Sequence, residues 1–321
     1  MKKLTKKIAD NPLKSLLAFL SFAITYGVML KTVAPTNSFW DCSERIATAY
    51  IMGIPHPPGA PLYLLLGRLF TIIPFSGDMA FRMNMISPLA SALSVTFLYL
   101  IIVKFLEKYV NMAKDIPKLS VYFGAFIGAL TYAFTDSHWF NSVEAETYIV
   151  SLFLTSFVMW LALRWEERAD TNGHERYLLF ISYIIGLAIG VHLLSILVIF
   201  VVALMIYFKY YKVSSLWWLV GDVVIGTSIS GIIFYVIYSS FPSPAESMGI
   251  IGVLTLGIFI GGYYLVKKYS SGDRLQEHST NVFMAFLTSL GFLLVHNGII
   301  RGIPKIIDQG GLLLLGVILL A

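Results

Sequence analysis

Apolar residues fill long stretches of this chain, and short polar segments separate these stretches from one another. A helix crosses the apolar part of a bilayer when it offers about 20 such residues in a row. The pattern therefore predicts membrane helices at residues 13–30, 81–105, 121–134, 147–163, 216–238, 249–266, 282–295 and 312–321. The stretch 177–208 is too long for one ordinary helix, and we predict a tight hairpin that turns near residues 190–195.

The segment after the first apolar stretch has a different pattern. Residues 38–52 place apolar and small side chains at helical spacing, which predicts a short helix lying along the membrane surface. Prolines between residues 55 and 61 end this helix, because proline lacks an amide donor and restricts the residue before it. A second apolar helix at residues 62–73 is too short to span. We therefore predict a large first loop, about residues 32–80, that contains short interfacial helices.

Composition fixes the broad class of protein. Of the 321 residues, 57% are hydrophobic and 13% are charged, whereas a soluble domain carries about 25% charged residues. We predict an all-α polytopic membrane protein with about 10 spans, in which residues 1–321 form a single transmembrane domain. The net charge of +5 is spread between the apolar stretches, so it does not indicate a nucleic-acid partner. Cys42 is the single cysteine, which excludes an intrachain disulfide and a cysteine-based metal site.

The basic residues also predict the orientation of the chain. Lysine and arginine gather near the N-terminus and around residues 104–118, 164–176 and 267–274, and cytoplasmic loops carry such an excess. The N-terminus is therefore expected in the cytoplasm. The first loop, residues 135–146, the turn near 190–195 and residues 296–308 are then expected together on the opposite side. The stretch 312–321 stops inside an unfinished span, so we expect that this chain is a fragment of a longer one.

Ionisable residues beside the membrane core are costly and are candidates for function. The predicted topology brings such residues together on one side, and these are Asp41, Glu44, His56, Arg68, Glu146, His192 and Arg301. A carboxylate beside apolar surface can act as a general base toward a hydroxyl. Arginine and histidine can hold a departing phosphate. These parts fit transfer of a group from a lipid-linked phosphate donor to a hydroxyl acceptor.

Each of these residues also has a purely structural interpretation. Asp41 and Glu44 fit a capping box at a helix start, and Arg45 fits a simple i,i+4 pair with Asp41. The sequence His-Pro-Pro-Gly is by itself a turn signal. His192 fits a hydrogen-bonded structural histidine. Glu144 and Glu146 fit the solvated start of a helix, where the helix dipole favours acidic residues.

Several blocks of sequence carry a resemblance to a known family. They are Phe39-Trp-Asp-Cys-x-Glu44, Ala47-x-Ala-Tyr50, His56-Pro-Pro-Gly-Ala-Pro-Leu62, Gly67-Arg-Leu-Phe70, Ala145-Glu-x-Tyr148 and Gly186-Leu-x-Ile-Gly-Val-His-Leu-Leu194. The chain resembles bacterial multi-pass proteins that are similar to eukaryotic protein O-mannosyltransferases, within the GT-C superfamily of membrane glycosyltransferases. It differs from the family pattern at Ser43, where the family has glycine, and at Arg45, where the family has an aromatic residue.

The resemblance implies a GT-C-like helix bundle, a C-terminal extramembrane region that is expected to be missing here, and an inverting glycosyltransferase. A sugar, with mannose as one candidate, would move from a polyprenyl-phosphate donor to a protein Ser/Thr hydroxyl or a glycan on the extracytoplasmic side. By position, Asp41 is then the candidate base and Glu44 its catalytic neighbour. His56, Arg68 and His192 are substrate or phosphate contacts, and Glu146 supports the site. With Asp41, Glu44 and Glu146 as the clear oxygen ligands, we favour catalysis without a divalent metal.

Two other functions fit the same sequence. The chain is alternatively a transporter or flippase of lipid-linked sugars, or a non-catalytic subunit of an envelope complex. Its charges gather in one loop and no repeat symmetry is evident, whereas transporters tend to show such symmetry. Apart from membrane lipids, the expected partners are the lipid-linked sugar donor and a protein or glycan acceptor. The resemblance places the protein in a bacterial inner membrane.

Overall fold

The computed structural model describes residues 12–57, 59–110, 117–211, 213–240 and 273–293. Every regular element in these residues is a helix, which confirms the all-α class. Five helical stretches are long and apolar enough to cross a membrane, as a multi-pass membrane protein requires, and they are Pro12–Thr32, Met79–Lys108, Thr147–Glu166, Leu193–Tyr210 and Leu216–Ile233. The prediction of about 10 spans is therefore not confirmed in the described part. The predicted spans 249–266 and 312–321 lie outside the described residues.

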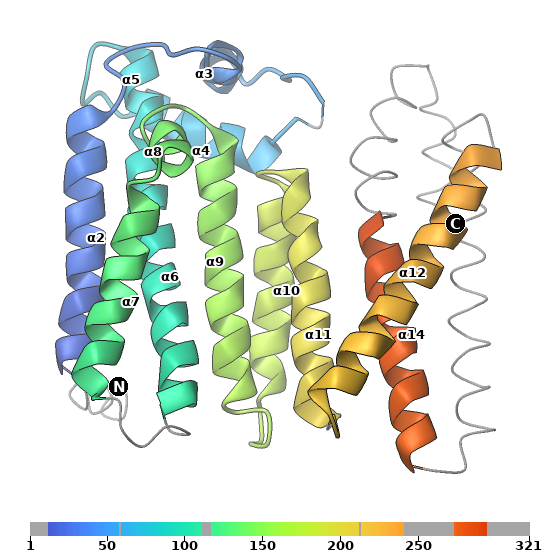
Figure 1. Ribbon diagram of the computed structural model, residues 1–321. Helices are drawn as coiled ribbons and strands as arrows, with labels where there is room; N and C mark the ends of the chain where they lie inside the picture. The colour runs from blue at the N-terminus through green and yellow to red at the C-terminus, as the bar shows by residue number, and fades with distance from the viewer. Residues whose placement is uncertain (1–11, 58, 111–116, 212, 241–272, 294–321) are drawn as a thin grey trace. The chain divides into compact units, whose positions relative to one another are not determined.

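The chain divides into two compact units, residues 1–198 and 199–321, which are described here one at a time. The first unit contains α2 (Pro12–Thr32), α3 (Cys42–Ile51), α4 (Pro61–Ile72), α5 (Met79–Asn84), α6 (Ile86–Val110), α7 (Lys118–Ala133), α8 (Asp136–Ser142), α9 (Thr147–Glu166), α10 (Glu175–Ile189) and the 3₁₀ helix η1 (Leu193–Leu197). Figure 1 shows α2, α6, α7 and α9 as long neighbouring helices, with α3 beyond one of their ends.

Helix α6 is the centre of the first unit, because α2, α7 and α9 all pack against it, while α10 packs against α9. On α7 the buried residues Ala125, Ala129 and Ala133 recur every four positions and join a cluster with Val95 and Tyr99 of α6. Small side chains let two helices approach closely in a membrane, where van der Waals packing and interhelical hydrogen bonds drive association. The alanine face of α7 therefore explains why this 16-residue helix packs tightly against α6.

The two short helices predicted in the first loop are confirmed as α3 and α4. Close packing joins them to α5 at Gly67 of α4. A Cβ atom at this position would lie 2.9 Å from the Cβ of Ala49 and 2.8 Å from the Cε of Met83. Glycine is therefore required where α4 crosses α3. This packing fixes the segment that carries Asp41 and His56.

Most predicted boundaries lie within a few residues of those observed, and two predicted helices differ from the structure. The expected helix 81–105 begins earlier, at Met79, where Asp78 caps α5 through a hydrogen bond from Phe81 N at 2.8 Å, and it is interrupted at Met85 between α5 and α6. The predicted turn near residues 190–195 is confirmed between α10 and η1. The expected helix 282–295 begins earlier, at Asp273.

The second unit is described through α11 (Val198–Tyr210), α12 (Leu216–Ser240) and α14 (Asp273–Leu293). A buried polar chain joins these helices. His278 Nδ1 lies 2.9 Å from Asp222 Oδ2, and Asn281 donates a hydrogen bond to the same carboxylate at 3.1 Å. Tyr207 donates to the side-chain oxygen of Asn281 at 2.9 Å. Hydrogen bonds of this kind hold apolar helices in one register, because the alternative is an unpaired polar group in hydrocarbon.

Candidate functional site

A cavity of about 70 Å³ in the first unit gathers residues from four segments that are far apart in the sequence. Its polar lining consists of Asp41, Arg45, His56, Thr147, Tyr148 and His192. The segments are the start of α3, the Pro/Gly turn before α4, the start of α9 and the turn after α10. The predicted convergence of these loops is therefore observed in the geometry of the first unit.

Glu44 holds His56 at the mouth of this cavity through two hydrogen bonds. The backbone N–H of His56 donates to Glu44 Oε1 at 2.7 Å, and Nδ1 of the ring lies 2.5 Å from Glu44 Oε2. The hydrogen bonds from His56 lower the pKa of the Glu44 carboxyl. The remaining ring nitrogen, Nε2, lies 3.8 Å from Asp41 Oδ2. The Glu44 side chain thus orients the His56 ring toward Asp41.

The capping-box interpretation of Asp41 and Glu44 is wrong. Asp41 occupies the N-cap position of α3, but its side chain makes no capping hydrogen bond. Its carboxylate instead accepts a hydrogen bond from Arg45 Nη2 at 3.2 Å, which confirms the predicted i,i+4 pair. The residue before it, Trp40, has φ 60°, a left-handed conformation that costs a non-glycine residue energy. The backbone therefore turns sharply just before Asp41.

Glu144 and Glu146 are buried, so the interpretation of a solvated helix start is wrong. Glu146 forms an ion pair with Arg45 and caps α9 by accepting from Thr147 N at 3.3 Å. Glu144 accepts a hydrogen bond from the hydroxyl of Ser38, and burial raises the pKa of its carboxyl. The acidic loop is therefore part of the interior that supports the cavity.

Cys42, Glu144 and Glu146 could hold a metal ion by geometry, because one ligand atom of each lies within 4.8 Å of the others. The Arg45 guanidinium already balances the charge of Glu146, and a cation would compete with it. Burial raises the pKa of the Cys42 thiol to about 12, so the thiol is neutral near pH 7. Function without a divalent metal stays a prediction.

One of the predicted substrate contacts, Arg68, is not brought to the cavity. Arg68 donates a hydrogen bond to the carbonyl of Tyr50 at 2.5 Å and lies over its ring, 5.6 Å from the centroid. It does not line the cavity. Arg301 lies outside the described residues. The guanidinium that lines the cavity is that of Arg45.

His192 lies at the cavity and also makes the hydrogen bond that the structural interpretation predicts, while its role as a substrate contact stays a prediction. It lines the cavity, and its ring lies 4.9 Å from the ring of Tyr148 between centroids. It also caps η1, because its Nδ1 accepts from Leu194 N at 3.2 Å. Burial lowers the pKa of its ring, which favours the neutral form. The Nδ1 acceptor leaves Nε2 as the nitrogen that carries the proton.

Sequence reasoning missed Tyr148 and Thr147 as cavity residues and treated Arg45 as a simple surface pair. Tyr148 belongs to the block Ala145-Glu-x-Tyr148, so the block itself is a signal that could have identified it. The burial of Arg45 had no such signal. It depends on Glu146, which is 101 positions away in the sequence and forms the ion pair only after folding.

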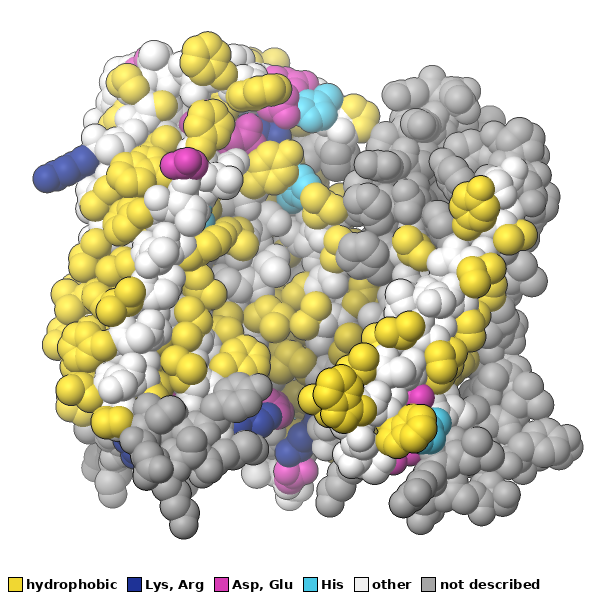
Figure 2. Space-filling model, viewed as in Figure 1, with side chains coloured by type: hydrophobic (Ala, Val, Ile, Leu, Met, Phe, Trp, Pro, Cys, Tyr) yellow, Lys and Arg dark blue, Asp and Glu magenta, His cyan; other side chains and the backbone are white. Residues whose placement is uncertain are grey.

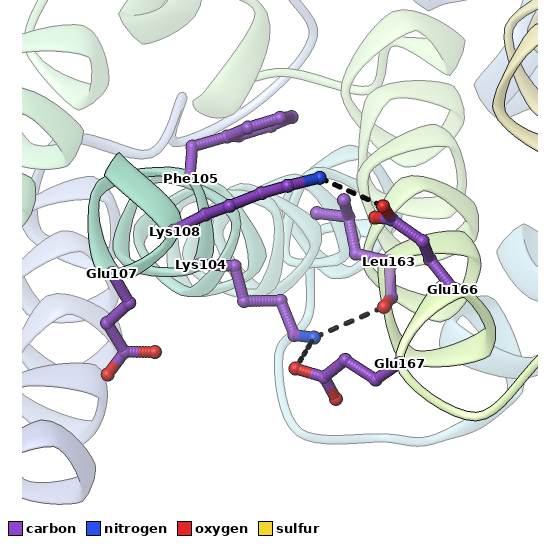
Figure 3. Close-up of a pocket in the computed structure, with 7 residues that line it drawn as sticks. All are labelled: Lys104, Phe105, Glu107, Lys108, Leu163, Glu166 and Glu167. Atoms are coloured by element: carbon purple, nitrogen blue, oxygen red, sulfur yellow. Dashed lines mark hydrogen bonds and ion pairs between the residues drawn. The ribbon is translucent and has the colours of Figure 1, made fainter. Parts of the chain in front are cut away.

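A larger cavity of about 310 Å³ lies at the other end of α9, where Lys104 and Lys108 of α6 face Glu166 and Glu167 (Figure 3). Its charges are matched in pairs. Lys108 Nζ lies 2.9 Å from Glu166 Oε1, and Lys104 pairs with Glu167. These pairs tie the ends of α6 and α9 together, and this cavity contains none of the predicted site residues.

The segment that carries Asp41 and leads to His56 also exposes apolar side chains. They are Phe39, Trp40, Ile51, Met52 and Ile54, and Trp40 and Ile54 are 82% and 91% exposed. Figure 2 shows acidic and histidine side chains gathered beside hydrophobic ones at this end of the unit. Contiguous exposed apolar side chains mark surfaces that contact a membrane or an apolar ligand.

Comparison with known proteins gives one family. The family model described as "Protein O-mannosyl-transferase TMEM260 N-terminal domain" matches residues 41–215, which include every residue that lines the cavity. The mouse (Mus musculus) protein O-mannosyl-transferase TMEM260 is 25% identical over 176 residues, which are 54% of this chain and 23% of the mouse protein. The Dictyostelium discoideum protein O-mannosyl-transferase tmem260 is 25% identical over 163 residues, 50% of this chain and 18% of that protein.

The chain thus covers less than a quarter of the length of these curated relatives. No solved structure matches it. These findings confirm the resemblance to protein O-mannosyltransferases that the sequence blocks indicate.

Proposed function

We propose, since the chain belongs to the protein O-mannosyl-transferase TMEM260 N-terminal domain family, that it is a membrane glycosyltransferase. The relatives are named for transfer of mannose to protein, so the proposed sugar is mannose and the proposed acceptor is a Ser/Thr hydroxyl. The observation that supports this best is the cavity, which unites Asp41, His56 and His192 from separate segments.

The proposed donor carries its sugar on a polyprenyl phosphate. The exposed apolar side chains of the segment that carries Asp41, including Phe39, Trp40 and Ile54, would accommodate the lipid tail. The cavity also offers groups suited to a phosphate, namely the Nε2–H of His192 and, in the protonated ring, the Nε2–H of His56. We place this site on the extracytoplasmic side, with the N-terminus in the cytoplasm.

In the proposed reaction the acceptor hydroxyl oxygen attacks the anomeric carbon of the sugar. A new carbon–oxygen bond forms as the bond between that carbon and the phosphate oxygen breaks. Asp41 takes the hydroxyl proton, and the lipid phosphate leaves as an anion. A protonated His56 ring, held by Glu44 through the 2.5 Å contact, donates its Nε2–H to the negative charge that develops on the phosphate. Direct displacement of this kind inverts the anomeric configuration.

A transfer assay tests this proposal. The full chain in lipid nanodiscs would receive radiolabelled polyprenyl-phosphate mannose and an acceptor protein, and Asp41→Asn would be compared with wild type. We expect Asp41→Asn to lower kcat by about 100-fold or more, because loss of a general base costs about 10²–10⁴-fold. Asp136→Asn is the matched control, because Asp136 is exposed in α8 and does not line the cavity.

The variants Glu44→Gln and His56→Gln test the second part of the mechanism. Both should lower kcat, and the double variant should be no worse than His56→Gln alone, because Glu44 acts through His56. Full transfer by Asp41→Asn would remove Asp41 as the base. Binding of the labelled lipid without any transfer by wild type would favour a carrier, and an absence of binding would remove the glycosyltransferase proposal.

A further inference from the structure

A buried ion pair connects the two segments that form the cavity. Arg45 on α3 and Glu146 at the start of α9 have side chains that are only 7% and 6% exposed. Arg45 uses one nitrogen for Glu146 and the other, Nη2, for Asp41 Oδ2 at 3.2 Å. We propose that Glu146 is a positioning residue that acts through Arg45 to hold the Asp41 carboxylate. The catalytic part of this inference rests on the proposed function of Asp41.

The orientation of the Asp41 side chain depends on a contact of this kind. It is 46% exposed, and it makes no capping bond to α3. Among the described side chains, Arg45 is the group that donates a hydrogen bond to it, while His56 Nε2 lies further away at 3.8 Å. A half-exposed carboxylate without this bond would be free to change rotamer. The planar guanidinium restricts it to one place, because each of its nitrogens points in a fixed direction.

Arg45 in turn is fixed by Glu146. The Oε2 atom of Glu146 pairs with Arg45, whereas Oε1 faces the thiol of Cys42 at 3.8 Å. The carboxylate also caps α9 through Thr147 N, and the backbone N–H of Glu146 donates to the carbonyl of Glu144 at 2.8 Å. Glu146 is therefore held on a rigid element. Because the Arg45 guanidinium contacts both carboxylates, the position of Glu146 determines where Arg45 holds the Asp41 carboxylate.

Neutral replacements can separate this role from a contribution to stability alone. Removing one partner of a buried pair leaves an uncompensated charge and is strongly destabilising, whereas replacing both partners is much milder. Arg45→Met and Glu146→Gln alone should therefore lower the melting temperature of the full chain, and the double variant should recover most of that loss. Lys108→Met/Glu166→Gln is a control, because this pair joins α6 to α9 at the other end of α9.

The contacts that run from Glu146 through Arg45 to Asp41 are called the bridge below. The single cysteine, Cys42, reports on this bridge without any need for activity. Cys42 is fully buried beside Glu146, so it should react slowly with a maleimide in wild type. Each single variant should speed the alkylation of Cys42 several-fold, and the double variant should return it toward the wild-type rate. Unchanged alkylation and melting in both single variants would overturn the bridge.

The decisive readout is the transfer rate of the double variant Arg45→Met/Glu146→Gln. If the bridge positions Asp41, kcat stays about 10- to 100-fold below wild type although stability is recovered, with KM little changed, since small misplacements of a catalytic group cost that much. Recovery of kcat together with stability would show a merely structural pair and would overturn the inference.

A thermodynamic cycle keeps the test independent of the proposed function. Asp41→Asn and Glu146→Gln should shift the melting temperature non-additively, because both act on Arg45, and should become additive in an Arg45→Met background. Additive shifts in the wild-type background would overturn the inference. A wild type that transfers no sugar but shows this coupling would count against the proposed glycosyltransferase and not against the bridge.

Discussion

Glu44 shows how one residue type at one spacing supports two roles. Three positions after Asp41, at the start of a helix, a glutamate fits a capping box as well as a catalytic pair. The fold selects neither a cap nor a bond between these two acidic residues. The chain turns back through its Pro/Gly segment and presents both the backbone N–H and the ring of His56 to the Glu44 carboxylate.

His138 carries a second prediction at the residue scale. It is buried in α8, and its Nε2 lies 2.8 Å from the hydroxyl of Ser91. Burial lowers the pKa of its ring from 6.5 to about 4. The folded state therefore keeps this ring neutral at pH values where the unfolded state is protonated. Its contribution to stability is complete above pH 6.5 and is lost as the pH falls from 6.5 toward 4.

The size of this loss follows from the shift in pKa. A shift of this size corresponds to about 3 kcal/mol of unfolding free energy between pH 7 and pH 4. The melting temperature of wild type should therefore fall over this range more steeply than that of His138→Gln, which lacks the titrating ring. Parallel curves for the two proteins would show that His138 is not the group responsible.

At the scale of elements, the crossing of α3 and α4 depends on Gly67. Gly67→Ala should lower the melting temperature, because its Cβ would meet the Cβ of Ala49 at 2.9 Å. Overpacking of this kind typically costs about 1–3 kcal/mol. The double variant Gly67→Ala/Ala49→Gly should recover part of the loss.

Gly27→Ala is the matched control for this prediction. Gly27 lies in α2, and no atom is found within 4 Å of the position that its Cβ would take. This variant should be neutral or slightly stabilising, because alanine favours a helix over glycine. A Gly67→Ala protein as stable as Gly27→Ala would contradict the close approach of the two helices.

At the scale of the whole molecule, the orientation of the first unit can be tested with introduced cysteines. Phe39 is 80% exposed, and it lies near the start of α9, since its neighbour Ser38 donates a hydrogen bond to Glu144. Asn172 is exposed beyond the other end of α9. In a Cys42→Ser background, Phe39→Cys and Asn172→Cys should react with an impermeant maleimide from opposite sides of the membrane. Phe39→Cys should react from the extracytoplasmic side. Labelling of both from one side would show that α9 does not span.

The fold was predictable to the extent that it follows from local pattern. The apolar stretches that became α2, α9 and α12 are long enough to identify without tertiary information, and α3 ends at Ile51, close to the predicted position, where Met52 takes a left-handed C-cap conformation ahead of the prolines. The division at Met85 was not predictable from hydropathy, because apolar residues continue across it. The start of α5 is set by the cap from Asp78, whose carboxylate also accepts a hydrogen bond from Thr36 in the first loop at 2.8 Å.

The sequence by itself determined the class of this protein and supplied most of the candidate residues of its site. Composition and apolar length require a membrane helix bundle, since no soluble fold could cover so much apolar surface. Only the tertiary structure decided which of those groups share a cavity. It placed Arg45 there and Arg68 at Tyr50, and it buried Glu146. The physical reason is that an ion pair such as that of Arg45 and Glu146 joins residues 101 positions apart, and local spacing carries no information about such a contact.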